Sequence, residues 1–265
     1  MSSRMNSSAA VTLLKELRTS LEARAEETGR SDKDKATGAK SSVKSLGARP
    51  AAVKTVVKDF LTKNRATVDY ASAVAMVDAA VARKVREEIL ATIEVLERFR
   101  REYETSLFPH FEKWSAVSDD MELAEVLGQR VGAPLLALDP SRMSVLKRWA
   151  KLRSVGKKRV AVLAACSLVS DGRRHSTPVL ELCELLLHED HPMLVGEIAS
   201  LLRDTTKVDA KGVQDFLFRR SVDGNPDILR AGSENLDAAR RAALIAKLEA
   251  QAATASGALT TAAGR

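Results

Sequence analysis

The sequence is poor in aromatic residues and in cysteine, and it has no long apolar run. Aromatic residues make up only 4% of the 265 positions, so the 45% hydrophobic fraction depends on Ala, Leu and Val. This composition favours closely packed helices over an aromatic-rich sheet. Two cysteines, Cys166 and Cys183, are too few for a disulfide framework or a zinc site, and we expect both in the core.

Signals for membranes and for export are also scarce. No apolar run approaches the roughly 20 residues that span a bilayer, so no membrane partner is expected. The polar stretch Met1–Ala10 lacks the apolar core of a secretion signal. We therefore expect a cytoplasmic protein, associated with the nucleoid in a bacterium or nuclear in a eukaryote.

Motifs for common cofactors are missing as well. The sequence has no phosphate loop, no dinucleotide fingerprint and no nucleophile elbow. The segment from His188 to His191 lacks the spacing of a metal-binding helix, and Pro192 follows at once, which favours a loop between helices. We expect neither a cofactor nor a metal ion.

The positive charge is concentrated in one segment. The net charge is +7, yet eight basic and no acidic residues lie between Arg142 and Arg159, so the rest of the chain sums to −1. Such a patch predicts a polyanionic partner. The alternative is a solvated, Lys-rich helix face. The basic residues are Arg142, Lys147, Arg148, Lys151, Arg153, Lys157, Lys158 and Arg159.

Apolar residues recur with the period of a helix. The clearest case has Val85, Ile89, Ile93, Leu96 and Phe99 on one face. Almost nothing alternates with period two, and the best strand candidate, residues 160–169, is Ala-rich, which favours a buried helix. The sequence therefore predicts an all-α protein.

Apolar segments also restart at regular intervals. They begin near Val85, Met121, Val160 and Leu194, at intervals of 36, 39 and 34 residues. This period is typical of helix-pair repeats of the HEAT or armadillo kind, which stack into a curved solenoid. We expect a single curved domain over residues 9–250 with a concave binding face, between a disordered N-terminus, residues 1–8, and a disordered tail, residues 251–265.

Four stretches resemble one family in the same order along the chain. They are a Leu-Gly turn before a helix-opening Pro (43–50), an acidic turn before Leu-Gly (118–128), a Trp before a basic helix start (149–161), and an amphipathic segment (197–203). Together they resemble the AlkD-type DNA alkylation repair proteins, HEAT-like repeat alkylpurine DNA glycosylases. The resemblance runs from about Ala36 to Leu248.

The resemblance implies hydrolysis of the N-glycosidic bond of N3- or N7-alkylpurines in double-stranded DNA. Alkylation makes the base cationic, and cleavage develops positive charge on the sugar, which a fixed carboxylate stabilises. The candidate carboxylate is Asp120, with Asp119 as a possible second one. The alternative role for both is capping of a helix N-terminus.

The resemblance also points to Arg159 as a residue that grips a phosphate beside the lesion. The alternative is a solvated residue in the first turn of a helix. We expect the neighbouring basic side chains to contact phosphates too: Lys147, Arg148, Lys151, Arg153, Lys157 and Lys158.

The chain departs from the family at the aromatic platform that contacts the damaged base. A gapless placement puts Ala116 and Ser200 where the family has tryptophans, and Trp114 lies two residues from the first position. This departure leaves open a non-catalytic protein that binds branched or distorted DNA through the same face. A protein-binding HEAT scaffold with an acidic partner is a third, weaker alternative. We expect a monomer.

Overall fold

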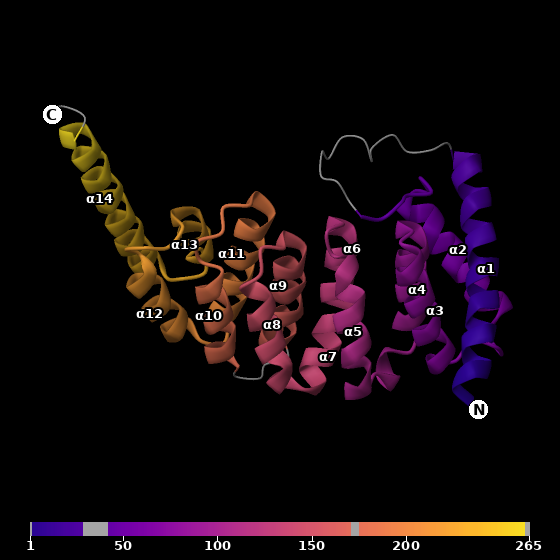
Figure 1. Ribbon diagram of the computed structural model, residues 1–265. Coiled ribbons are helices and arrows are strands. Elements are labelled where there is room, and N and C mark those ends of the chain that lie inside the picture. Colours follow the sequence, from indigo (N-terminus) through magenta and orange to yellow (C-terminus); the bar gives the residue numbers. More distant parts are fainter. Residues whose placement is uncertain (1, 29–41, 171–174, 263–265) are drawn as a thin grey trace. The chain divides into compact units, whose positions relative to one another are not determined.

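A computed structural model describes residues 2–28, 42–170 and 175–262, and its regular structure is helical (Figure 1). Within these ranges there is no strand, and one isolated bridge pairs Lys44 with Val85. The prediction of an all-α protein is confirmed. The segment 160–169, the best strand candidate, lies inside a buried helix.

Contacts divide the chain into two units, Met1–Leu138 and Asp139–Arg265, where the sequence predicts one domain over 9–250. The elements of unit 1 are the helices α1 (Ser2–Thr28), α2 (Pro50–Lys63), α3 (Tyr70–Arg83), α4 (Arg86–Glu97), α5 (Phe108–Trp114), α6 (Met121–Val126) and α7 (Ala133–Leu138), the 3-10 turns η2 (Arg100–Glu102), η3 (Thr105–Leu107) and η4 (Ser115–Val117), and the π-helical η5 (Leu127–Gly132).

Unit 1 is a two-layered stack. Helices α1, α3 and α5 pack in sequence order to form one layer, and α2, α4 and α6 form the other. Neighbours in the chain, such as α3 and α4, pack across the layers. The face of α4 that its apolar period predicts is the buried one, since Ile89, Ile93 and Leu96 are fully buried.

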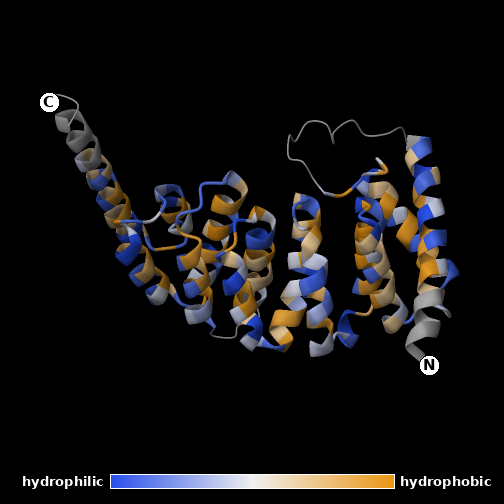
Figure 2. Ribbon diagram, in the orientation of Figure 1, coloured by the Kyte–Doolittle hydropathy of each residue, from blue (hydrophilic) through white to orange (hydrophobic). Residues whose placement is uncertain are grey.

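Unit 2 repeats this plan. It consists of the 3-10 turn η6 (Pro140–Arg142) and the helices α8 (Met143–Ala150), α9 (Val155–Ser170), α10 (Ser176–Leu185), α11 (Pro192–Thr206), α12 (Ala210–Arg220), α13 (Pro226–Gly232) and α14 (Ala238–Ala262). Helices α9, α11 and α13 form one layer, and α8, α10, α12 and α14 form the other. In both units, apolar and polar residues alternate along the helices (Figure 2).

In each unit, the helices of one layer begin at a nearly constant interval along the sequence. Helices α2, α4 and α6 begin at residues 50, 86 and 121, and α9, α11 and α13 begin at 155, 192 and 226. The prediction of a helical-repeat fold is confirmed. Proline helps to set the starts, because Pro50, Pro192 and Pro226 occupy first helical positions, where a missing N–H costs little.

Helix extends into both terminal segments for which the sequence predicts disorder. Helix α1 begins at Ser2 and α14 ends at Ala262, while Met1 and residues 263–265 lie outside the described ranges. Alanine, the strongest helix former, is frequent in α14 and gives a physical reason for the difference.

The helix that starts at Met121 is irregular in its middle. Helices α6 and α7 are joined without a break by η5, in which the Ala133 N–H donates to the Gly128 carbonyl five residues earlier. Pro134 follows directly and has no N–H to continue the ladder. The π-helical turn is therefore a widened stretch of one continuous helix.

Candidate functional site

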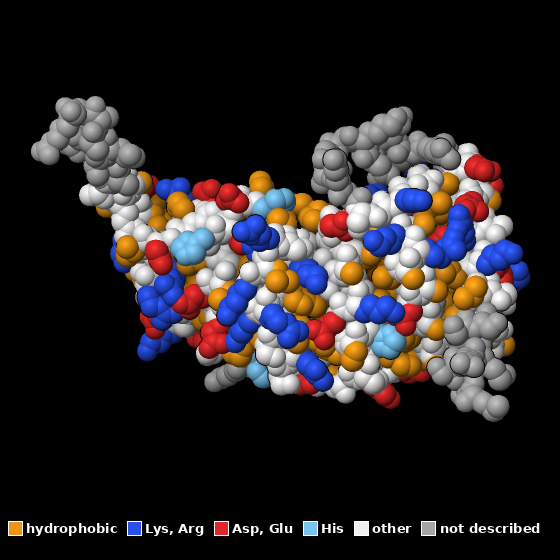
Figure 3. All heavy atoms as spheres, viewed as in Figure 1, with side chains coloured by type: hydrophobic (Ala, Val, Ile, Leu, Met, Phe, Trp, Pro, Cys, Tyr) orange, Lys and Arg blue, Asp and Glu red, His pale blue; other side chains and the backbone are white. Residues whose placement is uncertain are grey.

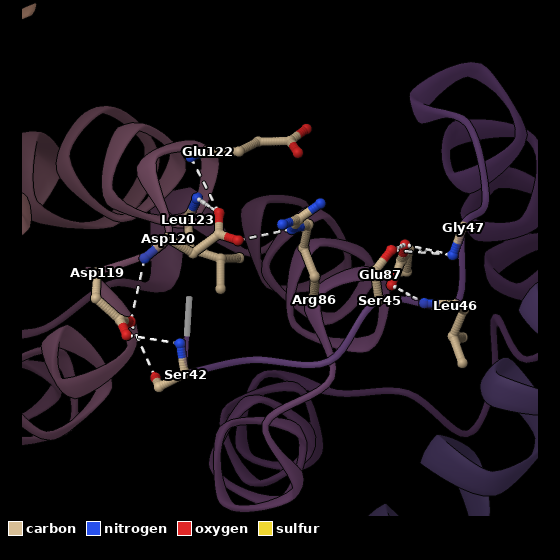
Figure 4. Close-up of polar contacts among 10 residues, drawn as sticks. All are labelled: Ser42, Ser45, Leu46, Gly47, Arg86, Glu87, Asp119, Asp120, Glu122 and Leu123. Carbon is tan, nitrogen blue, oxygen red and sulfur yellow. Dashed lines mark hydrogen bonds and ion pairs between the residues drawn. The ribbon is translucent and has the colours of Figure 1, made fainter. Parts of the chain in front are cut away.

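The start of α6 carries the two predicted carboxylates (Figure 4). Asp120 is its N-cap, and the Asp120 Oδ1 accepts hydrogen bonds from the N–H groups of Glu122 at 3.1 Å and Leu123 at 3.2 Å. The Arg86 Nε donates to the Asp120 Oδ2 at 2.7 Å. The residue is only 4% exposed. Asp120 is thus a helix cap, as the structural alternative predicted, and also one half of an ion pair.

Asp119 is the more accessible of the two carboxylates and meets neutral partners. The Ser42 N–H donates to its Oδ2 at 2.7 Å, and the Ser42 hydroxyl donates to its Oδ1 at 3.0 Å. The Asp120 N–H also reaches the Oδ1, at 3.1 Å. Asp119 therefore holds the chain at Ser42 against the start of α6.

The first turn of α4 links the segment from Ser42 to Gly47 to the start of α6, as Figure 4 shows. Next to Arg86, the carboxylate of Glu87 accepts from the Ser45 hydroxyl at 2.7 Å, the Leu46 N–H at 2.8 Å and the Gly47 N–H at 3.0 Å. Gly47 has a φ of 80°, which side-chain-bearing residues rarely adopt. Hydrogen bonds to the buried Glu87 thus hold the Leu-Gly turn against α4.

The structure gives none of the three predicted platform positions an exposed aromatic ring. Trp114 is fully buried, and its Nε1 donates to Asp78 at 2.9 Å. Ala116 is exposed and Ser200 is half-buried. Trp114 lies two residues from Ala116, and its side chain points into the core rather than toward the exposed face of Ala116.

Three of the predicted phosphate-binding cations in unit 2 are already paired with carboxylates. The Arg159 Nε donates to the Glu197 Oε1 at 2.6 Å, and Arg159 is only 5% exposed. Lys158 pairs with Glu189, and Lys147 with Glu181. Arg159 is therefore not a solvated residue of a first turn, and acids from α10, α11 and the loop between them reduce the charge of this segment.

The other cations of this segment lie around the turn between α8 and α9. Arg148, Lys151 and Arg153 are exposed, and the Lys157 ammonium lies 5.7 Å from the centre of the buried Trp149 ring. Lys151 and Arg153 form no ion pair within the described ranges. We name these four cations the α8–α9 cluster. Figure 3 shows Lys and Arg side chains over these helices, with acidic side chains beside them.

The remaining candidate groups are shielded. Cys183 is fully buried and Cys166 half-buried, and burial raises the pKa of the Cys166 thiol to about 11 and that of Cys183 further. Both thiols thus stay protonated and unreactive. In the described part of the chain, no three His, Cys, Asp or Glu side chains are grouped to hold a metal ion. No helix there is long and apolar enough to cross a membrane.

The predicted carboxylates and the predicted phosphate contacts lie in different units. Asp119 and Asp120 belong to unit 1, while Arg159 and the α8–α9 cluster belong to unit 2.

Comparison with known proteins adds one finding. A family model described as DNA alkylation repair enzyme matches residues 17–236, which is more than four fifths of the chain. The match contains both carboxylates, the Leu-Gly turn and the α8–α9 cluster. No curated protein matches the sequence.

Proposed function

Because the chain belongs to the DNA alkylation repair enzyme family, we propose that it binds duplex DNA containing alkylated purines and hydrolyses the N-glycosidic bond of N3- or N7-alkylpurines. The family match over residues 17–236 carries this proposal. The proposal also includes a HEAT-like solenoid fold and a monomeric state. It places the protein in the compartment that holds the DNA.

The α8–α9 cluster supplies the first contact with DNA. Its exposed cations suit phosphate oxygens, which take half or more of the hydrogen bonds in protein–DNA complexes. Lys147, Lys158 and Arg159 have a different role in this proposal, because each already binds a carboxylate. They fix the helices from which the cluster projects.

The carboxylates at the start of α6 supply the negative charge for bond cleavage. When the bond between C1′ and the base breaks, its electron pair leaves with the cationic base, which becomes neutral. The sugar is left with oxocarbenium character, and water then adds to C1′ and gives up a proton. A fixed carboxylate next to C1′ stabilises that cation.

The two carboxylates differ in how much of their charge is compensated. Arg86 neutralises Asp120, whereas the hydrogen-bond partners of Asp119 are neutral N–H and O–H groups. Asp119 is also more exposed than Asp120. Asp120 is the residue that the family motif indicates, but Asp119 is the better placed to meet a sugar. The proposal therefore includes both residues.

A second candidate function is binding of branched or distorted DNA without catalysis. Specific observations favour it: Ala116 and Ser200 carry no ring, and Trp114 is buried. In addition, Asp120 and Arg159 are both buried and both form ion pairs. A protein with this arrangement has kept the scaffold of the family while its aromatic contacts to the base are missing.

Base release from methylated duplex DNA tests the proposal. We expect the purified protein to release 7-methylguanine or 3-methyladenine, detected by mass spectrometry. Loss of the catalytic carboxylate, by Asp119→Asn or Asp120→Asn, should lower excision about 10²–10³-fold and leave duplex affinity unchanged. Asp59→Asn, which removes an exposed carboxylate on α2, is the matched control.

Other outcomes point elsewhere. If the wild type releases no base but binds bulged or junction DNA tightly, the glycosylase proposal is wrong and the binder is supported. If it binds no DNA at low salt, both DNA functions fail, and a protein-binding scaffold is the remaining alternative.

A further inference from the structure

Unit 1 contains a second cationic surface, which the local charge of the sequence does not reveal. An open groove runs along α2 and α4, and we name it the α2–α4 groove. The charged residues that line it are Lys54, Lys58, Arg65, Glu94, Glu97 and Arg98.

The cations of this groove are available to a ligand, whereas its carboxylates are not. Lys54, Lys58, Arg65 and Arg98 are exposed, and none of them forms an ion pair with a described residue. Glu94 and Glu97 are both bound by Arg130, at 3.4 and 2.9 Å. The groove therefore presents four positive charges that no described carboxylate binds, while Arg130 offsets half of the negative charge of its two glutamates.

The α2–α4 groove continues toward the carboxylates. A smaller adjoining hollow shares Lys54 and Glu94 with it and is also lined by Glu122 and Arg130. The Glu122 N–H donates to the Asp120 Oδ1, so the hollow ends beside the start of α6. Both hollows lie within unit 1.

We infer that the α2–α4 groove binds the sugar–phosphate backbone of the DNA strand that leads to Asp119 and Asp120. The inference rests on the proposed function and extends it with a second contact surface in the other unit. In this inference, Lys54, Lys58, Arg65 and Arg98 contact phosphates, and the strand lies along α2.

The shape of the groove favours a nucleic-acid strand over an acidic protein. Lys54 and Lys58 lie one helical turn apart, about 6 Å along α2, which suits the regular spacing of charges on a strand. Apolar side chains lie between the cations: Val57 is buried beneath the groove, and the half-buried Leu61 is accessible to a sugar. Acidic side chains on one helix face also repeat at about 6 Å, so the mixed cationic and apolar lining, rather than the spacing alone, favours a nucleic-acid strand.

The salt dependence of duplex binding tests this inference. In Lys54→Gln/Lys58→Gln, the slope of log affinity against log salt should become shallower by about 2, because each lost phosphate contact contributes roughly 0.9. The control, Lys15→Gln/Lys63→Gln, removes the same charge from exposed positions outside the groove, where Lys63 pairs with Glu16. Its slope should match the wild type. Circular dichroism should show both variants folded.

The outcomes separate this inference from the proposed function. If the wild type binds duplex and both double variants show its slope, the groove does not contact DNA, although the proposed function stands. If the groove variant loses affinity for polyglutamate but keeps its duplex slope, the groove binds protein and the inference is overturned. If the wild type binds no duplex, the inference and the proposed function fail together.

Discussion

Two partly buried ion pairs connect residues that lie about one repeat apart. Arg86, the first residue of α4, binds Asp120 at the start of α6, and Arg159 in α9 binds Glu197 in α11. In each pair the acidic residue belongs to the next helix of the same layer. Removing one partner of such a pair leaves the other charge uncompensated and costs about 2–4 kcal/mol, somewhat less than for a fully buried pair. These side chains therefore hold adjacent repeats together.

We expect Asp120→Asn to destabilise the protein even though it preserves the helix cap. Asparagine caps as well as aspartate, so the loss, about 2–4 kcal/mol, comes from the ion pair with Arg86. Arg86→Gln should cost a similar amount. Urea denaturation of both single variants and of the double variant measures their coupling, which we expect at about 1–3 kcal/mol.

A coupling near zero would contradict the pairing of Arg86 with Asp120. Asp119→Asn is the companion measurement, because the hydrogen-bond donors to Asp119 are neutral. Its cost should be about 1 kcal/mol, the size of one or two ordinary hydrogen bonds.

The sequence identified the carboxylates but not what binds them. The acidic turn at Asp119 and Asp120 could be found from a local motif, and helix capping was predictable from its position. The roles of Arg86 and Glu87 could not be predicted, because their partners lie 34 to 42 residues away and no local motif indicates the contact. For the same reason, the pairing of Lys158 with Glu189 is invisible to a local count of charges.

Helices α11 and α13 pack closely at one glycine. A methyl group on Gly232, the last residue of α13, would lie 2.8 Å from the Leu202 Cδ1 and 3.2 Å from its Cβ. Gly196, inside α11, has open space where a methyl group would go. The two glycines therefore differ in what substitution does to them.

We expect opposite effects from the same substitution at these positions. Gly232→Ala should destabilise the protein by about 1–3 kcal/mol, because the methyl group forces α11 and α13 apart. Gly196→Ala should stabilise it by up to about 1 kcal/mol, because alanine favours the helix. Thermal unfolding of the two variants checks this, and equal shifts of one sign would contradict the packing of α13 on α11.

Elements were predictable where the apolar period is regular. The stripe from Val85 to Phe99 indicated α4, although Val85 is its N-cap and Phe99 lies beyond its end. The restarts near Met121 and Leu194 fall on α6 and α11. The π-helical η5 was not predicted, because a widened turn is a property of the backbone ladder that residue types indicate weakly.

At the scale of the whole molecule, the charge is spread more widely than the sequence suggests. The basic segment 142–159 holds more than the entire net charge of +7. In the structure, Glu181, Glu189 and Glu197 compensate three of its cations. Unit 1 contributes the α2–α4 groove, whose cations are scattered along the sequence among acidic residues.

Salt titration distinguishes the cations of the α8–α9 cluster from Lys158, which is bound to Glu189. If the α8–α9 cluster contacts phosphates, its four cations contribute about −4 to the slope of log duplex affinity against log salt. Lys151→Gln/Arg153→Gln should make the total slope shallower by about 2. Lys158→Gln, which removes a cation bound to Glu189, should leave the slope nearly unchanged. An equal change per cation in all variants would contradict the assignment.

The widened turn η5 determines which residues of the long helix from Met121 to Leu138 face the core. Leu123, Leu127, Val131 and Leu135 are all buried and recur every four residues. In a regular α-helix, each step of four residues advances the side chain about 40° too far, and three steps would rotate Leu135 out of the core. The extra residue of the π turn absorbs this drift. Deleting one residue here would swing the following side chains by about 100°, so the length of this segment matters more than the identity of its exposed residues.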